Sequence, residues 1–410
     1  MQPKIYSTQE HGIDHSLIDL DALYVLEKLR KAGFIAYLVG GSVRDLLIKK
    51  IPKDFDISTS ARPEQIKSLF QRQCLLIGRR FRLAHIRFGH KVIEVATFRT
   101  GENDSGLIIR DNEWGTPAQD VLRRDFTING IFYDAADHSI IDYVGGWDDI
   151  QQRLLRTIGQ PEMRFKQDPV RLLRLLKFQA RYGFSIDPTV EEVIPLCRKD
   201  ILKSSPARIL EEIFRMLESG ASASFFRLIA EYGLLSLLFP HLMRALHTPQ
   251  GKFIFHYLAC ADQLHQHKGK NTLDRAVLAT CLVFPLLEQE LRHAFLSKSH
   301  IPHIGEITLT ASSVVKDIFL SAFSHFPRRI ASMVTSILVA QYRMTPLSGK
   351  RHYREKLFRY KDFHLALSFL KLRALVDAQW VDIYTSIRNQ YRQSLHHDSG
   401  ERKHHPPPHQ

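Results

Sequence analysis

LVGGSVRDLLIKKIPKDFDISTSA, residues 38–61, joins a strand-like run to two glycines and then to a helix-like run. Gly40 and Gly41 at this corner let the backbone approach a ligand without interference from a Cβ atom. The helix that follows carries Arg44 and points free N–H groups at an anion near its start. The corner therefore predicts a site for a triphosphate, contacted by Gly40, Gly41 and Arg44.

The end of the same stretch carries two closely spaced carboxylates, Asp54 and Asp56. In a β-strand alternate residues share a face, so both carboxylates would lie side by side with Phe55 turned toward the core. Such a pair repels unless a cation lies between its members, and Mg²⁺ prefers oxygen ligands that include substrate phosphates. A lone Asp-x-Asp is more often an exposed turn, but the glycine corner just upstream favours a site for Mg²⁺.

The chain changes character along its length. Short β-branched and aromatic runs alternate with turns at first, and apolar residues recur at helical spacing from Asp168 onward. Strands are predicted at Phe34–Val39, His85–Phe88, Val92–Phe98 and Ile140–Val144, and a helix at Pro63–Phe70. The predicted divisions are an N-terminal arm and helix (1–30), an α/β head with a mixed sheet (31–155), an all-α neck (156–225), a helical body (226–390) and a disordered tail (391–410).

Composition limits the class of protein. The 410 residues carry a formal net charge of +14, which favours a polyanionic partner such as nucleic acid. The four cysteines form no Cys-x-x-Cys pair, which argues against a disulfide scaffold or a zinc site. The N-terminus lacks a signal-peptide core, and the apolar run Ala276–Leu287 is too short to span a bilayer. We expect a cytoplasmic protein without membrane partners, with this run in a buried helix.

The glycine corner followed by Asp-x-Asp resembles the DNA polymerase β-like nucleotidyltransferases, in the version of their class II branch. Residues 123–129, RRDFTIN, extend the likeness. In that family the motif's Asp is counted among the catalytic residues and its Arg helps to hold the incoming nucleotide. The resemblance therefore implies that Asp125 is a third catalytic carboxylate and that Arg124 binds nucleotide. Taken alone, the motif is equally typical of an Arg-Asp surface pair that opens a helix.

A further motif, residues 167–174 (QDPVRLLR), resembles the family's EDPxRxLR helix, which selects the base without a nucleic-acid template. The resemblance implies nucleotide-binding roles for Asp168, Arg171 and Arg174. Gln167 replaces the usual Glu, and Lys177 stands where many members have Arg. From the residues alone, a capped amphipathic helix with solvent-facing arginines is the alternative.

Two flanking motifs complete the likeness. Residues 142–149, DYVGGWDD, resemble the family's flexible segment between head and neck, for which an ordinary glycine turn is the alternative. Residues 206–212, PARILEE, resemble the last neck motif, and here a supporting structural role is expected. The clear matches extend over residues 10–240.

The choice between the family's two activities depends on other residues. Residues 76–86, LIGRRFRLAHI, resemble a signature that marks bacterial poly(A) polymerases. Arg79, Arg80 and Arg82 in it bring positive charge for RNA, and a basic hairpin that binds any RNA backbone is the bland alternative. Arg351 and Arg354 belong to a second basic, tyrosine-containing stretch at residues 342–361, where RNA contact is also expected.

The resemblance implies addition of AMP from ATP to RNA 3′ ends, largely independent of RNA sequence. Asp54 and Asp56 would hold two Mg²⁺ ions and Asp125 would assist, while the RNA 3′-hydroxyl attacks the α-phosphate and pyrophosphate departs. The alternatives are a CCA-adding tRNA nucleotidyltransferase and an inactive relative that only binds RNA.

Overall fold

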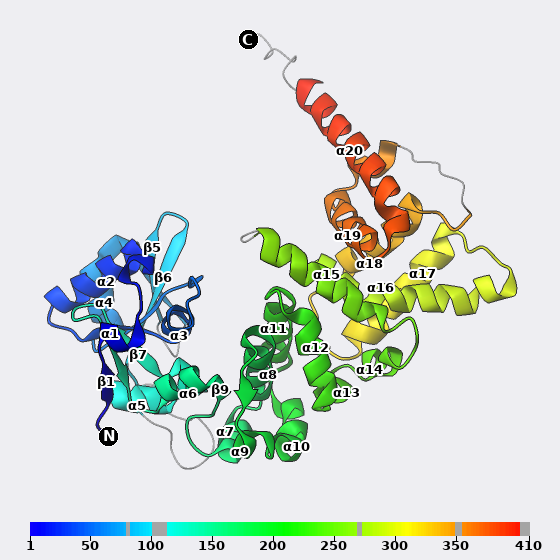
Figure 1. Ribbon diagram of the computed structural model, residues 1–410. Helices are drawn as coiled ribbons and strands as arrows, with labels where there is room; N and C mark the ends of the chain where they lie inside the picture. The colour runs from blue at the N-terminus through cyan, green and yellow to red at the C-terminus, as the bar shows by residue number, and fades with distance from the viewer. Residues whose placement is uncertain (79–82, 101–112, 269–272, 349–354, 402–410) are drawn as a thin grey trace, which may run out of the picture. The chain divides into compact units, whose positions relative to one another are not determined.

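The computed structural model describes residues 1–78, 83–100, 113–268, 273–348 and 355–401 (Figure 1). They form two compact units, one of residues 1–200 and one that begins at residue 201. The first unit contains a mixed sheet with helices, and the elements described in the second are helical. The predicted α/β head followed by helices is therefore confirmed. None of the helices in the described ranges is long and apolar enough to cross a membrane.

An eight-stranded sheet forms the centre of the first unit, in the order β1-β8-β7-β2-β3-β6-β5-β4. Its strands are β1 (Lys4–Tyr6), β2 (Ala36–Val39), β3 (Asp56–Thr59), β4 (Cys74–Ile77), β5 (Leu83–Phe88), β6 (Lys91–Thr97), β7 (Ile131–Asp134) and β8 (Ser139–Asp142). Neighbours β3 and β6 are parallel, and the other neighbouring pairs are antiparallel. The four predicted strands are present as β2, β5, β6 and β8 with slightly shifted ends.

The helices of the first unit follow local sequence signals. Helix α4 begins at Pro63 and has the predicted bounds, because proline is favoured in the first helical turn. The helices are α1 (Thr8–His11), α2 (Leu20–Lys31), α3 (Gly41–Leu47), α4 (Pro63–Phe70), α5 (Pro117–Leu122), α6 (Gly146–Gln152), α7 (Pro161–Gln167), α8 (Val170–Tyr182), α9 (Pro188–Glu191) and α10 (Ile194–Cys197), and a short parallel pair joins β9 (Leu154–Leu155) to β10 (Ser185–Ile186).

The two faces of the large sheet have different neighbours. Helix α2 packs against β2 and β3, whose cross-strand partners Leu38 and Ile57 are fully buried. Successive side chains point to opposite faces, and Val39 packs with Phe132 and with Val121 of α5 in another core cluster. Polar side chains that share the face of Val39 therefore lie on the α5 side of the sheet.

One detail of the predicted strand is wrong. Strand β3 begins at Asp56, so Asp54 precedes the strand instead of lying in it. The reason is the partner strand: Val39 pairs with Asp56 and is the last residue of β2, because the chain turns into α3 from Gly41 onward. No strand lies opposite Asp54 to extend the ladder.

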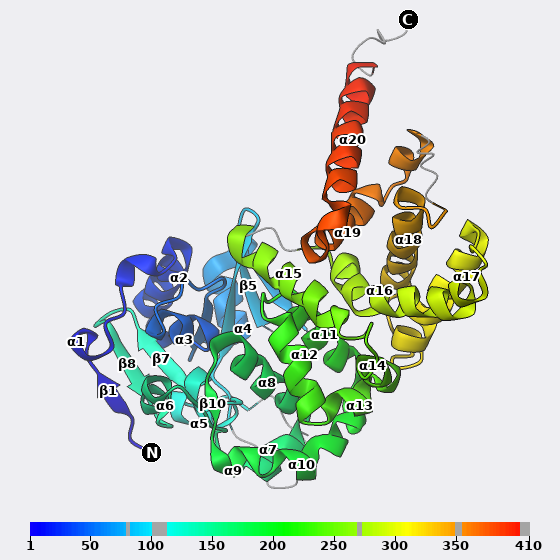
Figure 2. The ribbon, with the colours of Figure 1, turned by 45° about the vertical axis from the view of Figure 1, so that its right-hand side comes forward.

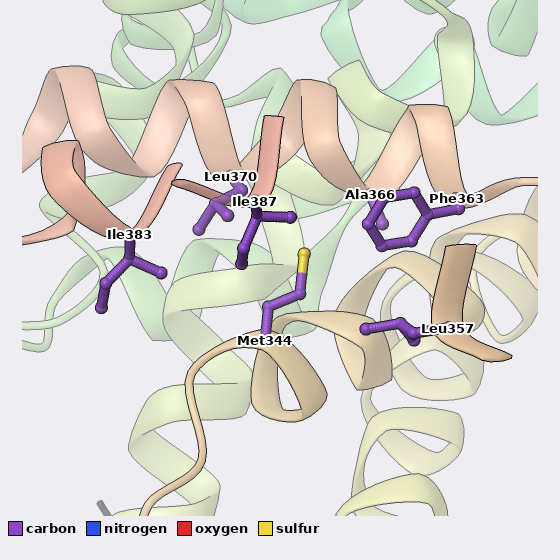
Figure 3. Packing of buried hydrophobic residues seen from close by; sticks show 7 residues of the cluster. All are labelled: Met344, Leu357, Phe363, Ala366, Leu370, Ile383 and Ile387. Carbon is purple, nitrogen blue, oxygen red and sulfur yellow. The ribbon is translucent and has the colours of Figure 1, made fainter. Parts of the chain in front are cut away.

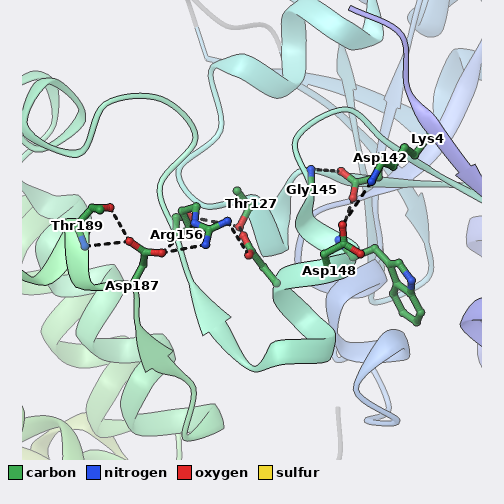
Figure 4. Close-up of polar contacts among 10 residues, drawn as sticks. Lys4, Thr127, Asp142, Gly145, Asp148, Arg156, Asp187 and Thr189 are labelled. Atoms are coloured by element: carbon green, nitrogen blue, oxygen red, sulfur yellow. Dashed lines mark hydrogen bonds and ion pairs between the residues drawn. The ribbon is translucent and has the colours of Figure 1, made fainter.

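A buried carboxylate holds the turn between β8 and α6. Asp142 accepts hydrogen bonds from backbone N–H groups of this turn, including that of Gly145 at 2.9 Å (Figure 4). Gly145 has a φ of +77°, whereas a Cβ on Gly146 would lie 2.2 Å from the carbonyl oxygen of Thr127. The two glycines therefore serve different purposes: Gly145 supplies left-handed backbone and Gly146 permits a close approach.

An arginine ties this turn to the helices that follow. Arg156 lies 3.2 Å from the Asp149 carboxylate of α6 and 2.9 Å from that of Asp187 at the start of α9 (Figure 4). Asp149 also accepts a hydrogen bond of 2.6 Å from the hydroxyl of Thr127. The RDFTIN segment is thereby fixed to α6 and to the first neck helices.

The second unit is a stack of helices with its own core. Its helices are α11 (Pro206–Leu217), α12 (Ser222–Glu231), α13 (Leu234–Leu238), α14 (Pro240–Leu246), α15 (Phe253–Lys268), α16 (Arg275–Ala294), α17 (Ile304–Val315), α18 (Arg328–Met344), α19 (Phe363–Val376) and α20 (Val381–Glu401). Every residue of 276–287 is buried in α16, so the predicted buried helix is confirmed. Figure 3 shows Met344, Leu370 and Ile387 meeting where α18, α19 and α20 pack.

The predicted disordered tail at 391–410 is wrong for its first part, because α20 continues to Glu401. Figure 2 shows α20 as one continuous helix leaving the neighbourhood of α19. The physical reason is an apolar anchor: the ring of Tyr391 packs edge-on against Phe363, with centroids 4.9 Å apart. Residues 402–410 lie outside the described ranges.

Candidate active site

The glycine corner leaves space beside a cationic group. Gly40 has φ +70° and ψ −131°, a conformation that residues with a Cβ rarely adopt. A Cβ at this position would lie 3.5 Å from Nη1 of Arg124. Arg124 donates through Nη2 to the Ser58 hydroxyl at 3.2 Å and to Asp120 at 3.0 Å. The corner without a side chain therefore lies next to a guanidinium whose position is fixed by Ser58 and Asp120.

Asp54 and Asp56 lie next to this corner. Asp56 pairs with Val39, the residue before Gly40, so its side chain lies at the corner on the face of Val39. Phe55 is buried between two exposed aspartates, and the charge of Asp54 acts on the carboxylate of Asp56. The structure therefore brings the two carboxylates together beside the glycines, although Asp54 lies outside the strand.

A third carboxylate, Glu94, stands beside them and was not recognised in the sequence. Glu94 on β6 is the direct neighbour of Asp56 in the parallel β3–β6 pair, so both side chains share one face. Although part of the Asp56 side chain stays accessible, loss of water around its carboxylate raises the pKa of Asp56 to about 6, the charges of Glu94 and Asp54 add to the rise, and Arg124 opposes it. Glu94 also lies 3.4 Å from Nε2 of His85.

The sequence signal for Glu94 is a single acid between apolar residues in the strand KVIEVAT. That pattern is equally common in a half-exposed strand of no catalytic importance. Its place beside Asp56 depends on the pairing of β3 with β6, between which α4, β4 and β5 intervene in the chain. Local periodicity does not encode that pairing.

The donor set fits magnesium bound together with a nucleotide. Asp54, Asp56 and Glu94 offer oxygen donors, and a cation relieves their mutual repulsion. Within the described residues, no group of three or more His, Cys, Asp or Glu side chains converges as a complete metal site. Mg²⁺ does not need one, since one or two carboxylates commonly hold it while substrate phosphates and water supply the other ligands.

Asp125 connects the RRDFTIN segment to α8. Its Oδ1 accepts a hydrogen bond of 2.9 Å from the side-chain amide of Asn129, and its Oδ2 lies 3.8 Å from Nη1 of Arg174. The carboxylate is thus engaged on both oxygens, once by the adjacent loop and once by the helix predicted to select the base. Through these two contacts Asp125 connects Asn129, which follows it in the same segment, to Arg174 of α8.

Arg44 is buried within a polar network. Its Nη1 donates to the side-chain oxygen of Asn129 at 2.6 Å, and its Nη2 donates to Asp45 at 2.8 Å and to the hydroxyl of Tyr182 at 2.7 Å. That hydroxyl donates in turn to Asp45 at 3.0 Å. The guanidinium is 4.7 Å from the Tyr182 ring centroid. Arg44 therefore links the helix after the glycine corner to the end of α8.

We expect Tyr182→Phe to lower the free energy of unfolding by about 1–2 kcal/mol, because a buried Arg44 donor and a buried Asp45 acceptor each lose a partner. Urea denaturation measures the change. Tyr37→Phe in the same unit is the comparison, since it removes the hydroxyl of a half-buried tyrosine in strand β2. Equal effects of the two substitutions would contradict the assigned role of the Tyr182 hydroxyl.

The base-selecting residues lie at the start of α8, but not all within it. Helix α8 begins at Val170, so Asp168 precedes it as the C-cap residue of α7, whereas Arg171 and Arg174 lie within α8. The carbonyl of Asp168 accepts from the N–H of Arg171 at 3.0 Å. Arg171 is buried, with Nη1 2.9 Å from the carbonyl of Arg164. Arg174 is half-exposed and reaches Asp125.

Arg164 is a structural residue that the sequence did not single out. Its Nη2 donates to the carbonyls of Arg123 and Arg124, at 3.1 and 2.6 Å. Its Nη1 donates to the side-chain oxygen of Gln167 at 3.2 Å. Gln167, which replaces the family's usual Glu, therefore accepts this hydrogen bond as an uncharged amide. Arg164 thereby fixes the backbone of the RRD segment against α7.

The residues predicted to bind RNA, namely Arg79, Arg80, Arg82, Arg351 and Arg354, lie outside the described ranges. Strands β4 and β5, which flank residues 79–82, form an antiparallel pair with Ile77 opposite Leu83. This pairing does not test the roles of the five arginines, which stay predictions.

Two family models match the chain. The poly(A) polymerase head domain matches residues 36–156, which include the glycine corner, the three carboxylates and the RRD segment. A probable RNA and SrmB-binding site of polymerase A matches residues 183–246. The matches thus lie in the described sheet and in the helices that follow α8.

Relatives of two kinds are similar to the chain. Poly(A) polymerase I of Escherichia coli is 37% identical over 392 residues, with 92% of this chain and 83% of the relative covered. The CCA-adding enzyme of Bacillus subtilis is 38% identical over 206 residues, with 50% of this chain and 51% of the relative covered. The crystal structure of the Bacillus stearothermophilus CCA-adding enzyme in complex with CTP superposes with a TM-score of 0.65 and 25% identity, covering 91% of this chain and 82% of that chain.

Proposed function

The chain belongs to the bacterial poly(A) polymerase family of nucleotidyltransferases, and we propose that it adds AMP from ATP to RNA 3′ ends without a template. The observation that carries this proposal is the arrangement of Asp54, Asp56 and Glu94 beside the glycine corner and Arg124. Nucleotide and RNA are its substrates, and addition proceeds with little dependence on RNA sequence.

The extent of the likeness favours polyadenylation over CCA addition. The alignment with the poly(A) polymerase relative covers 92% of this chain, whereas the alignment with the Bacillus subtilis CCA-adding enzyme covers 50%. The second unit of this chain is thus largely included in the first comparison. Since the two activities act on different RNA primers, sequence identity that continues into the second unit supports poly(A) synthesis.

The residues of the corner bind and orient the reacting groups. Gly40 and Gly41 leave room for the triphosphate because they have no side chains. The guanidinium of Arg124, next to Gly40, pairs with the negative charge of the phosphates. Asp54, Asp56 and Glu94 are the residues that would hold divalent cations at this corner. When bound there, Mg²⁺ would supply Lewis-acid activation of the RNA 3′-hydroxyl and charge neutralisation at the leaving pyrophosphate.

Adenine selection is assigned to the start of α8. Arg174 and Asp168 present a guanidinium and a carboxylate, groups that can donate to ring nitrogens and accept from the adenine amino group. Asp125 positions Arg174 through their contact at 3.8 Å. Arg171 supports this site from its buried position, and the Arg44–Tyr182 network fixes α8 to the corner.

Nucleotide choice and product length test the function. We expect purified protein with Mg²⁺ and a 5′-labelled single-stranded RNA to give an unbounded ladder of products with ATP alone. CTP alone should extend the primer far less, because the paired carboxylate and guanidinium are assigned to adenine. Gel electrophoresis of the products reads both results.

The same assay separates the alternatives. A tRNA that lacks its CCA end, extended by three nucleotides and no further when CTP and ATP are present, would establish CCA addition instead. Absence of any extension, with RNA binding intact, would make the chain an RNA-binding relative without activity.

A further inference from the structure

A groove of about 1090 Å³ lies within the second unit, whereas the carboxylates belong to the first. It is lined mainly by α19, α20 and the start of α16, with Glu218 after α11 and Leu264 of α15. Helices α19 and α20 pack directly on each other, so the walls of the groove belong to one packed body.

Helix α20 divides its surface between a core stripe and a groove stripe. Ile383 and Ile387 are buried among residues of α18 and α19 (Figure 3). Residues four apart lie on one side of a helix, and the adjoining stripe Tyr384, Arg388 and Arg392 lines the groove. Because the isoleucines are buried in the core, the neighbouring face of α20, with Tyr384, Arg388 and Arg392, points into the groove.

The acids of the groove are already engaged within the protein. Glu218 pairs with Arg275 at 2.7 Å, and Asp274 accepts from the backbone N–H of Ala276 at 2.7 Å to cap α16. In contrast, Arg388 is partly exposed, Arg392 is exposed, and neither forms an ion pair within the described part of the chain. The groove thus presents uncompensated positive charge, which is the charge complement of a phosphate backbone.

Aromatic rings accompany this charge. Tyr384 and Tyr391 both line the groove and are half-buried, with Tyr391 held edge-on by Phe363. Rings anchored in a core and open on one side are suited to contact bases, and this contact tolerates any base. An acidic polypeptide would satisfy the arginines but would leave the rings without planar partners.

We propose that this groove binds the single-stranded part of the RNA substrate, with phosphates at Arg388 and Arg392 and a base against Tyr384. The proposal rests on the RNA-extending function given above and identifies where that function holds its primer. It also accounts for the position of Arg388 and Arg392 on α20, next to the buried Ile383 and Ile387 and facing the groove.

The double variant Arg388→Gln/Arg392→Gln of the full chain tests the groove. We expect the Kd for a 5′-fluorescein-labelled 20-nucleotide single-stranded RNA to rise about tenfold at 0.1 M salt, and the slope of log K against log salt to fall by about 1.4, since each phosphate contact on a single strand contributes about 0.7. Fluorescence anisotropy measures both. In AMP addition, KM for the RNA should rise while kcat and KM for ATP stay unchanged.

The matched control is Arg328→Gln/Arg329→Gln, which removes the same charge from exposed arginines of the same unit outside the groove. If both double variants weaken RNA binding equally, the proposed groove site is wrong, and the overall positive charge of the chain accounts for RNA binding. Displacement of RNA by poly-glutamate of equal charge with equal potency would also overturn it, in favour of an acidic protein partner.

Failures of the two proposals are distinguishable. If the wild-type chain binds RNA more tightly than the groove variant but adds no AMP, the groove stands and the function fails. If the wild-type chain extends RNA and the groove variant matches it in Kd, salt slope and KM, the function stands and the groove is wrong.

Discussion

Asp56→Asn is expected to lower kcat for AMP addition by about 10³-fold or more, because a ligand that positions charge against the triphosphate is lost. Charge stabilisation of this kind contributes several kcal/mol to the transition state, and 1.36 kcal/mol corresponds to a factor of about ten. Asp54→Asn should act in the same direction. Initial rates with saturating ATP and labelled RNA measure the effect.

The substitution should leave the fold intact, since Asn has nearly the same shape and removes repulsion from Asp54 and Glu94. A second readout separates binding from catalysis: Mg²⁺ with ATP should raise the melting temperature of the wild-type chain and raise that of Asp56→Asn much less.

Asp148→Asn is the matched control for this prediction. Its carboxylate is exposed in α6 and lies 3.6 Å from the exposed ammonium of Lys4 (Figure 4). A surface pair of this kind contributes little to stability, so kcat should equal that of the wild type. Wild-type kcat in both Asp54→Asn and Asp56→Asn would disprove the assignment of the carboxylates.

Gly146→Ala is expected to destabilise the first unit by about 3 kcal/mol. A Cβ at this position would lie 2.2 Å from the carbonyl oxygen of Thr127. The colliding atom is backbone and Thr127 is also held by Asp149, so the segment cannot move aside without breaking a buried hydrogen bond. Because Trp147 is adjacent, urea denaturation followed by tryptophan fluorescence reports on this turn.

The neighbouring glycine provides the control. Gly145 has a φ of +77°, and a Cβ on it would have no atom within 4 Å, so Gly145→Ala meets backbone strain without a collision. A left-handed residue with a Cβ costs about 1 kcal/mol. The prediction for Gly146 fails if the two substitutions lower the free energy of unfolding by the same amount.

The sequence by itself determined the features that depend on neighbours along the chain. Backbone sterics and the two-residue period of a strand act locally. They were sufficient to predict the glycine corner, the alternation of Asp54, Phe55 and Asp56, and the start of α4 at Pro63. The resemblance carried by these motifs identified the class of enzyme for the same reason, since the residues within each motif are close together in the chain.

The tertiary structure alone decided which distant residues meet. Glu94 joins Asp56 only because β3 and β6 pair, and Arg44 meets the hydroxyl of Tyr182 across 138 positions of sequence. Asp54 falls outside its strand because β2 has already ended opposite it. These outcomes follow from strand pairing and side-chain packing between separate segments, which the periodicity of a single segment does not specify.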